Sequence, residues 1–364
     1  MKKLFTSESV TSGHPDKICD LIADSILDAA LAQDKYSHMA VEATIKNELI
    51  FVYGEAGTKA DLDYEKIALD VLKQIGYTED YKVITKIDRQ SPEINHAVSQ
   101  KEIMAGDQGI IFGFACDETE EAMPLSMDLA HKLARMLEEV RRANPGILQP
   151  DGKTQVTVEY EDDRIVRLDT ILVSTSHFAG ITNDFLRDFV KKEVILPVCP
   201  KDLIDENTRF IINPSGAFTV CGSFGDSGTT GRKIVVDTYG GHGHIGGGCF
   251  SSKDPSKVDR TAAYYARYVT KNLVRNGLCR KCEIQLAYAI GMRDPVSVYL
   301  DCFGTNTLPM DRIMEIIHEN FDFSVSNMIE ELDLLRPIYT QTTNYGHFGK
   351  KDLPWEKVID LKVL

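Results

Sequence analysis

Glycines are concentrated in one part of this chain, where residues 222–260 hold 10 of the 26. Glycine loses more backbone entropy on folding than any other residue and has no side chain to pack. So dense a cluster is typical of tight turns, or of backbone that approaches a ligand closely. Acidic and basic side chains lie among these glycines, a mixture suited to phosphate oxygens and to metal ions that bridge them. They belong to Asp226, Arg232, Lys233, Asp237, Lys253, Lys257 and Asp259.

Composition alone leaves a second interpretation of residues 222–260 open, a glycine-rich loop whose charges are solvated. The segment has no GxxxxGK[ST] signature, the usual sequence of a phosphate-binding loop. Residues 233–239 have the apolar pattern of an ordinary strand, so spacing by itself does not decide between a ligand site and a surface loop.

The size and charge of the chain exclude several classes of protein. With 364 residues it can form two or three domains, and its formal net charge of -14 argues against general nucleic-acid binding. The polar start and the lack of an apolar run near ~20 residues predict a cytoplasmic protein with no signal peptide and no membrane partner. The eight scattered cysteines are expected to be reduced thiols, and the lone pair Cys279 and Cys282 makes a zinc site the less favoured interpretation.

Apolar periodicity predicts helices and strand pairs along the chain. The helices are expected over residues 15–33, 61–75, 125–140, 185–197, 257–277 and 309–321, and the strand pairs over 40–46 with 49–54, 154–160 with 165–174, and 283–290 with 296–300. Strand pairs followed by helices indicate an α+β fold with antiparallel pairing rather than βαβ winding. Residues 91–107 lack a clear period, which predicts a long loop of the kind that covers active sites.

Two polar residues lie where the first predicted helix begins. Pro15 is suited to the first helical position, so His14 and Asp16 fall at the helix N-terminus. This end carries partial positive charge and free N–H groups, which suit anion binding. The residues alone favour a plainer interpretation, in which Asp16 interacts with the helix dipole and His14 is a surface side chain.

Long motifs spread over residues 5–349 resemble those of the S-adenosylmethionine synthetase (methionine adenosyltransferase) family, and they occur in the family's order. They read FTSESVTSGHPDKICD, QSPEIN, AGDQG, FIINPSGAF, GDSGTTGRKIVVDTYGG, KDPSKVDR, YAIG and YGHFG. The resemblance implies three similar α+β domains related by pseudo-threefold symmetry, with sequence boundaries at 1–95, 105–222 and 223–364. It also implies a tight homodimer with active sites at the interface, often paired into a tetramer.

The reaction implied by this resemblance makes S-adenosylmethionine from ATP and L-methionine. Displacement at C5′ of ATP releases tripolyphosphate, which is then hydrolysed to pyrophosphate and phosphate. A thioether sulfur is nucleophilic and has no proton to lose, so no activated serine, cysteine or histidine is required. Such a site must orient two substrates and stabilise charge on the departing triphosphate. The rival hypotheses are a general ATP-hydrolysing phosphotransferase and a catalytically inactive nucleotide-binding protein, which would lack metal or phosphate ligands.

The resemblance also assigns roles to residues of this chain. The catalytic donors are His14, Lys153, Arg232, Lys233, Lys253 and Lys257. The residues expected at ATP or methionine are Glu55, Gln90, Asp107, Asp151, Ser174, Phe218, Asp226, Asp259 and Lys257. Two Mg²⁺ ions are assigned to Asp16 and Asp259, and K⁺ to Glu42 and Asp226. Without the resemblance, Glu42 is a solvated strand residue, Asp151 and Lys153 belong to an ordinary turn, and Phe218 is a core aromatic.

Two segments depart from the family pattern. The segment His96–Met104, within the region expected to be a mobile lid, is shorter than in many members. Residues 240–246 read GGHGHIG, so His244 and Ile245 replace the Arg-His pair usual in the family. We therefore expect the local geometry or the subunit contact to differ there, while the core site residues remain.

Overall fold

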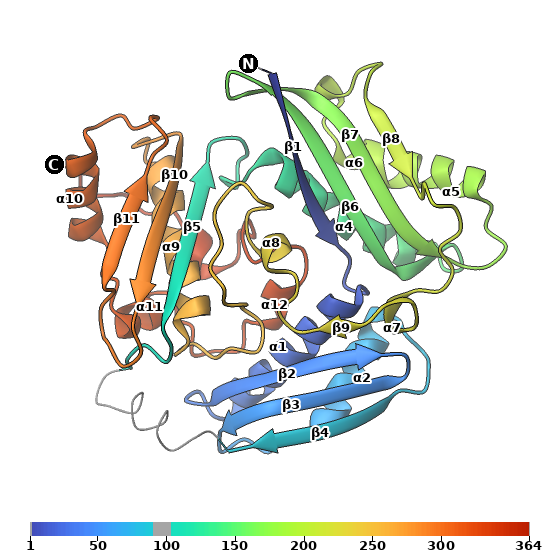
Figure 1. Cartoon of the computed structure of the whole chain (residues 1–364), viewed down its shortest axis with the longest axis horizontal. Helices are drawn as coiled ribbons and strands as arrows, with labels where there is room; N and C mark the ends of the chain where they lie inside the picture. The colour runs from blue at the N-terminus through green and yellow to red at the C-terminus, as the bar shows by residue number, and fades with distance from the viewer. Residues whose placement is uncertain (1, 90–102, 364) are drawn as a thin grey trace.

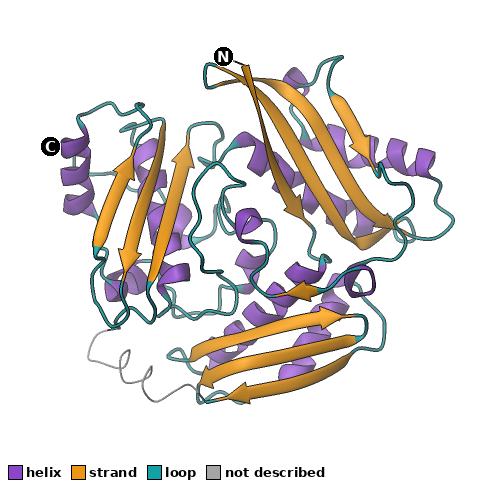
Figure 2. Cartoon of the chain, in the orientation of Figure 1, coloured by secondary structure: helices purple, strands orange, loops and turns teal. Residues whose placement is uncertain are grey.

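The computed structural model describes residues 2–89 and 103–363. Three β-sheets are arranged around a central region of helices and loops (Figure 1). Each sheet packs against at least one helix (Figure 2). This mixture of mainly antiparallel sheets and separate helices confirms the predicted α+β class.

The first sheet has the strand order β4-β3-β2-β9 and packs against α1 and α2. Its elements are α1 (Pro15–Gln33), β2 (His38–Lys46), β3 (Leu49–Gly57), α2 (Tyr64–Ile75), β4 (Lys82–Asp88) and β9 (Gly228–Thr229). The predicted first helix and first strand pair are confirmed. In the β2–β3 register Glu42 lies opposite Tyr53, and Glu55 lies opposite Ala40.

The second sheet has the order β1-β6-β7-β8 and is covered by α4. Its elements are β1 (Lys2–Val10), α4 (Leu125–Ala143), β6 (Leu148–Glu161), β7 (Arg164–His177) and β8 (Arg209–Ile212). The polar start of the chain was not predicted as a strand, yet it pairs with β6 along its whole length. Its buried hydroxyls are satisfied by distant partners, since Ser7 contacts Ser126 and Ser9 contacts His131.

The third sheet has the order β11-β10-β5, with α9 packed across β5 and β10. Its elements and neighbouring helices are β5 (Gly109–Cys116), α9 (Val258–Arg275), β10 (Lys281–Tyr288), β11 (Ser297–Asp301), α10 (Met310–Asn320) and α11 (Val325–Glu331). Short helical segments connect the rest: α5 (Asn183–Val190), η1 (Lys191–Ile195), α6 (Leu196–Val198), η2 (Lys201–Leu203), α7 (Gly222–Gly225), α8 (Ile234–Asp237), α12 (Thr340–Thr343) and η3 (Pro354–Glu356).

Every sheet combines strands that are distant in sequence. β1 pairs with β6, β2 pairs with β9, and β5 pairs with β10. One hydrophobic core runs from α1 and β2 through α9 to β10, and a second lies between α4 and the β6–β7 pair.

The sequence boundaries 1–95, 105–222 and 223–364 stay a prediction. Across the described residues no helix is long and apolar enough to cross a membrane.

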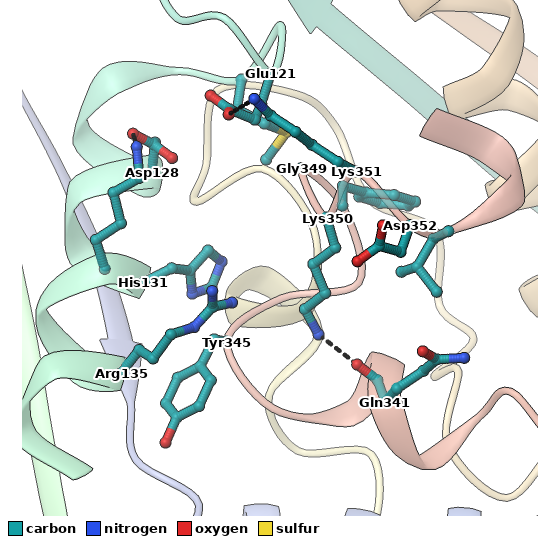
Figure 3. A pocket seen from close by; sticks show the side chains of 14 residues that line it. Glu121, Asp128, His131, Arg135, Gln341, Tyr345, Gly349, Lys350, Lys351 and Asp352 are labelled. Atoms are coloured by element: carbon teal, nitrogen blue, oxygen red, sulfur yellow. Dashed lines mark hydrogen bonds and ion pairs between the residues drawn. The ribbon is translucent and has the colours of Figure 1, made fainter. Parts of the chain in front are cut away.

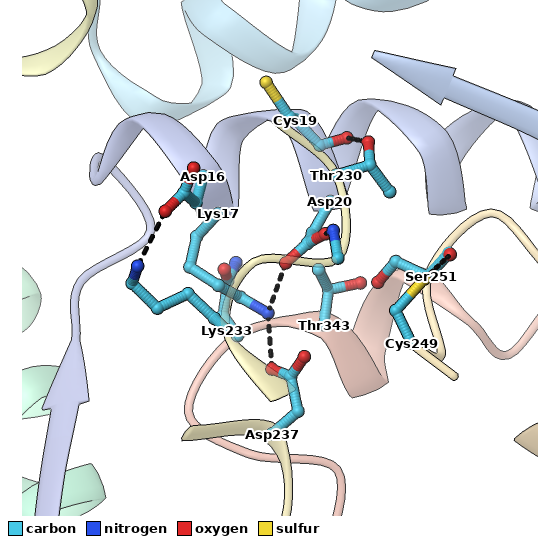
Figure 4. Close-up of polar contacts among 12 residues, drawn as sticks. Asp16, Lys17, Cys19, Asp20, Thr230, Lys233, Asp237, Cys249, Ser251 and Thr343 are labelled. Atoms are coloured by element: carbon cyan, nitrogen blue, oxygen red, sulfur yellow. Dashed lines mark hydrogen bonds and ion pairs between the residues drawn. The ribbon is translucent and has the colours of Figure 1, made fainter. Parts of the chain in front are cut away.

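The prediction of a strand over residues 233–239 is wrong, because Ile234–Asp237 form the short helix α8. Tertiary contacts override the local apolar pattern here. The buried carboxylate of Asp237 accepts a hydrogen bond from the Lys17 ammonium at 2.7 Å (Figure 4). At Gly240, φ is 62° and an added Cβ would lie 2.3 Å from Met127 and 2.5 Å from Ser7. Only glycine therefore fits at this position.

A buried carboxylate, Asp24 on α1, joins segments that are far apart in the chain. It accepts two hydrogen bonds from the Arg260 guanidinium, at 2.8 and 3.0 Å, and one from the Thr343 hydroxyl at 2.7 Å. The Ser251 hydroxyl donates to it at 2.9 Å. This one side chain therefore ties α1 to the glycine-rich segment, to α9 and to α12.

We expect Asp24→Asn to lower the free energy of unfolding by about 3–5 kcal/mol, because it leaves the Arg260 charge buried without its counter-ion. Denaturant unfolding of the purified protein measures this loss. The matched control is Asp70→Asn on α2, where the exposed carboxylate lies 4.0 Å from Lys73 and should matter little. Equal unfolding midpoints for the two variants would contradict the role given to Asp24.

Candidate active site

A cavity of about 420 Å³ opens where α1 begins. Its walls come from the start of α1, from β6 and β7, and from the segment that follows β8. Six predicted site residues line it together: His14, Asp151, Lys153, Ser174, Phe218 and Asp226. The fold thus brings together side chains that lie up to 212 positions apart in the chain.

The N-terminus of α1 forms the floor of this site. His14 is the N-cap, and its Nδ1 accepts a hydrogen bond from the backbone N–H of Asp16 at 3.2 Å. Burial, with the charges of Lys233 and Lys153, lowers the pKa of His14 to about 3, so the imidazole is neutral. The approach of Gly228 to Pro15 requires a glycine, since an added Cβ would lie 2.2 Å from the Pro15 carbonyl oxygen.

The carboxylate of Asp16 collects donors from the glycine-rich segment. It accepts the Lys233 ammonium at 2.6 Å (Figure 4) and the Thr229 N–H at 2.9 Å, and Arg232 Nε lies 3.5 Å away. Although burial opposes ionisation, the bonds from Lys233 and Thr229 hold the pKa of Asp16 below its usual value. Asp16 is therefore an ionised carboxylate already surrounded by the cations expected to bind phosphate.

The opposite wall presents polar groups from β6 and β7. Lys153 pairs with Ser174 across the two strands. Beside them, Asp151 is buried and accepts the Gly222 N–H at 2.9 Å. Burial raises the pKa of Asp151 to about 6, and the Gly222 N–H and the Lys153 charge only partly offset this. The half-buried Phe218 is held by its backbone N–H, which donates to His177 Nε2 at 3.1 Å.

A second cluster of predicted residues lies where α9 begins. Lys253 forms an ion pair with Asp259, and the Lys257 ammonium contacts Asp254 at 3.1 Å. An added Cβ at Gly248 would lie 2.1 Å from the Asp259 carboxyl carbon, so glycine lets that loop close over the carboxylate. Asp107 is exposed nearby, two residues before β5.

The two clusters lie along one edge of the first sheet. Thr44 of β2 pairs with Thr229, next to the Asp16 cluster, and Ala40 of β2 bridges to Lys253 in the second cluster. Four strand residues separate these contacts, or roughly 13 Å of strand. Glu42 lies between them on the same face of β2, 3.5 Å from the Tyr53 hydroxyl. Glu55 pairs with Ala40 on β3, whereas Gln90 and His96–Glu102 lie outside the described residues.

Contacts behind the His14 loop were missed by sequence reasoning. Glu138 of α4 accepts the Ser12 hydroxyl at 2.7 Å and is also bonded by the Tyr345 hydroxyl. Arg142 donates to the other oxygen of Glu138 at 2.6 Å. The local sequence signal for these contacts is the YGHFG motif, to which Tyr345 belongs. Nothing in the sequence indicates that this motif lies near Ser12. These contacts hold the loop that precedes His14.

The described residues contain no group of three or more His, Cys, Asp or Glu side chains arranged to hold a metal ion. Mg²⁺ usually binds one or two carboxylates together with substrate phosphates and water, rather than a cage made by the protein alone. Single carboxylates beside lysines, as at Asp16 and Asp259, fit an ion that is shared with a polyphosphate. No disulfide forms among the cysteines, which are all free thiols.

These features define a class of protein in which lysines, an arginine and carboxylates converge beside the N-termini of two helices. Comparison with known proteins identifies the family. Models of the N-terminal, central and C-terminal domains of S-adenosylmethionine synthetase match residues 2–101, 102–218 and 220–357. An S-adenosylmethionine synthase from Desulfosudis oleivorans is 49% identical over 369 residues, covering 97% of this chain and 95% of the relative. The chain belongs to the S-adenosylmethionine synthetase family, which confirms the predicted enzyme class and three-domain architecture.

We expect Tyr345→Phe to lower kcat about tenfold with little change in KM, because Glu138 loses a hydrogen bond and the Ser12 side of the His14 loop loosens. Steady-state kinetics separate kcat from KM, and thermal unfolding checks the fold. Tyr36→Phe is the matched control, since Tyr36 is exposed on the loop after α1. An unchanged kcat in Tyr345→Phe would show that this contact does not position the loop.

We expect Asp151→Asn to raise the melting temperature more at pH 8 than at pH 5. The pKa of Asp151 is about 6 in the folded chain and about 4 in an unfolded chain, so folding takes up a proton between these values. The stability from this group is complete below pH 4 and is lost as the pH rises through 6. Thermal unfolding of both proteins at both pH values measures the difference, and an equal shift at pH 5 and pH 8 would contradict it.

Proposed function

We propose that this enzyme forms S-adenosylmethionine by attack of the methionine sulfur on C5′ of ATP, and then hydrolyses the tripolyphosphate to pyrophosphate and phosphate. The observation that carries this proposal is the convergence of Lys233, Arg232 and the neutral His14 on the N-terminus of α1. The reaction needs oriented substrates and a stabilised triphosphate leaving group, and this arrangement supplies the donors for both.

The tautomer of His14 supports a role at the phosphates. Its Nδ1 accepts the Asp16 N–H, so in the neutral ring the proton sits on Nε2. Nε2 would then donate a hydrogen bond to a phosphate oxygen without adding a charge. Lys153, Lys233 and Arg232 would carry the positive charge around that oxygen, and Lys253 and Lys257 would extend it along β2.

The metal ions would share the same phosphate oxygens. Asp16 and Asp259 would hold the two Mg²⁺ ions, which neutralise charge that develops on the leaving triphosphate. Glu42, between the two clusters, and Asp226, exposed at the cavity mouth, would help to place K⁺. Both clusters keep their carboxylates beside lysine ammonium groups, so each ion would replace or join an existing ionic contact.

The remaining predicted residues would hold the organic parts of the substrates. Asp151 and Ser174 would bind the nucleotide, and Phe218 would stack on adenine, as their positions on the cavity wall allow. Glu55, Gln90 and Asp107 would contact methionine or adenosine. The buried thiols suit the reducing cytoplasm, where we place the enzyme.

The open face of the first sheet supports a homodimer with shared sites. Because α1 and α2 pack on the other face, Phe51 and Tyr53 stack on an uncovered face at 4.9 Å. Ile84 of β4 is 53% exposed on this face, in register with Phe51. Glu42 and Glu55 belong to it as well, so a second subunit seated here would meet predicted site residues. Pairing of two such dimers into a tetramer is part of the same proposal.

The proposal is tested by incubating the protein with ATP, Mg²⁺ and K⁺, with and without methionine, while adenosylmethionine and phosphate are followed together. We expect the sulfonium product and phosphate only when methionine is present. Phosphate release that is indifferent to methionine, without a sulfonium product, would instead favour a general ATP-hydrolysing phosphotransferase.

We expect Arg232→Leu to slow tripolyphosphate hydrolysis by about ten- to a hundredfold, and to slow adenosylmethionine formation less. The Arg232 side chain is 52% exposed, whereas that of Lys233 is only 17% exposed, so the Arg232 guanidinium is the more accessible of the two cations beside Asp16. There it would grip two oxygens at the far end of the phosphate chain during attack by water.

Single-turnover adenosylmethionine formation and hydrolysis of added tripolyphosphate are the two rates to compare. Arg164→Leu, at the exposed first residue of β7, is the control and should change neither rate. An equal fall of both rates in Arg232→Leu would show that Arg232 serves general substrate binding.

A further inference from the structure

Residues 243–248 wrap around β5, an edge strand of the third sheet, before the chain reaches α9. At Gly243 an added Cβ would lie 3.0 Å from Phe114 of β5, and at Gly246 it would lie 2.0 Å from the Ile110 carbonyl oxygen. The backbone of this segment therefore lies directly against the strand. The segment includes the two positions at which this chain departs from the family pattern.

A carboxylate on the open face of the third sheet anchors this segment. An added Cβ at Gly113, which pairs with Ile284, would lie 2.4 Å from Ala266 of α9, so the next side chain of β10, Glu283, points to the opposite face. Glu283 Oε2 accepts the His244 backbone N–H at 2.7 Å, and the His244 Nδ1 lies 2.7 Å from Oε1. The Glu283 side chain is only 10% exposed, and within the described residues its oxygens bond His244 alone.

Beyond this anchor the segment has no polar contacts to hold it. Residues 245–248 make no hydrogen bond with any described residue. Yet an added Cβ at Gly248 would lie 2.1 Å from the Asp259 carboxyl carbon, and one at Gly109 would lie 2.8 Å from Asp259 Oδ1. Backbone therefore closes on this carboxylate from two directions, and one of the two segments depends on the bonds made by Glu283.

The orientation of the Asp259 carboxylate depends on this packing. The carboxylate forms an ion pair with Lys253, beside the place proposed for Mg²⁺. One small cavity is lined by His244, Gly248 and Asp259 together, so the anchor and the carboxylate belong to one packed unit. A shift of residues 245–248 would leave Asp259 free to rotate away from Lys253 and from the metal.

We propose that Glu283 is a positioning residue for the metal site at Asp259, and that it acts through His244. Its two bonds fix the start of residues 244–248, and the backbone at the end of that segment fixes the direction of the carboxylate. Groups that orient a metal ligand without touching the metal typically change metal affinity about 10- to 100-fold. This inference rests on the proposed function, in which Asp259 holds Mg²⁺.

The first test is Mn²⁺ binding to the full-length protein, followed by electron paramagnetic resonance with one equivalent of a non-hydrolysable ATP analogue. Mn²⁺ serves as the probe for Mg²⁺, and a titration of the analogue alone is the blank. We expect Glu283→Ala to weaken one class of Mn²⁺ sites about tenfold, because residues 244–248 lose their anchor. Glu283→Gln keeps an acceptor for the His244 N–H and should retain wild-type affinity.

Two further variants complete the comparison. His244→Ala removes only the ring bond of a side chain that is 77% exposed, so it tests the same contact in a folded protein, with an expected loss of about threefold. Gln285→Ala is the matched control and should bind Mn²⁺ as the wild type does. Gln285 lies two residues further along the same face of β10, and its side chain bonds none of the described residues.

Amide hydrogen exchange without metal or nucleotide tests the anchor itself. We expect the His244 amide to exchange at least about tenfold faster in Glu283→Ala than in the wild type, and at the wild-type rate in Gln285→Ala. Faster exchange with unchanged Mn²⁺ affinity would overturn the proposal, because Glu283 would then serve the fold alone. Equal loss of affinity in Glu283→Ala and Glu283→Gln would overturn it as well, since charge rather than the bonds to His244 would then matter.

Asp259→Asn separates this proposal from the proposed function. We expect it to weaken the same class of Mn²⁺ sites. Weakening in Asp259→Asn with none in Glu283→Ala would overturn the positioning role and leave the metal role of Asp259 intact. Wild-type Mn²⁺ affinity in Asp259→Asn would contradict both. Neither binding nor exchange requires turnover, so these outcomes do not depend on which reaction the enzyme performs.

Discussion

The buried ion pair of Asp24 with Arg260 holds the architecture together. Burying two charges costs several kcal/mol each, and only good geometry with further hydrogen bonds offsets that cost. Here Arg260 makes two bonds to the carboxylate, while Ser251 and Thr343 donate to the same oxygens. Because α1 carries His14 and Asp16 at its start, and α9 carries Asp259 in its first turn, this pair fixes the spacing of the two site clusters.

A second buried network explains the path of the glycine-rich segment. Lys17 lies between Asp20 at 3.0 Å and Asp237 at 2.7 Å, and these carboxylates raise its pKa although burial opposes them (Figure 4). Asp237 can reach Lys17 only if residues 234–237 coil back toward α1. That coil brings Lys233 against Asp16, so the buried Lys17–Asp237 pair positions an ion pair of the candidate active site.

Tyr345 connects the candidate active site with the cavity between α4 and residues 341–353, which it lines (Figure 3). Its hydroxyl bonds Glu138, which holds Ser12 beside the His14 loop, and its ring lies under Arg135 in the other cavity. The two cavities are therefore joined by contacts, although they share no lining residue.

Motifs and apolar periods are local properties of the chain, so the sequence could be used to predict what depends on them. The motifs indicated the family and the candidate site residues, and the apolar periods indicated the helix 15–33 and the hairpins. Tertiary structure decided the features that local sequence did not predict. These are the strand β1, the helical turn at 234–237, the two clusters on one edge of β2 and the contact of Ser12 with Glu138. Their partners lie more than 100 positions away or across sheets, and local sequence does not encode which distant group satisfies a buried charge or an edge strand.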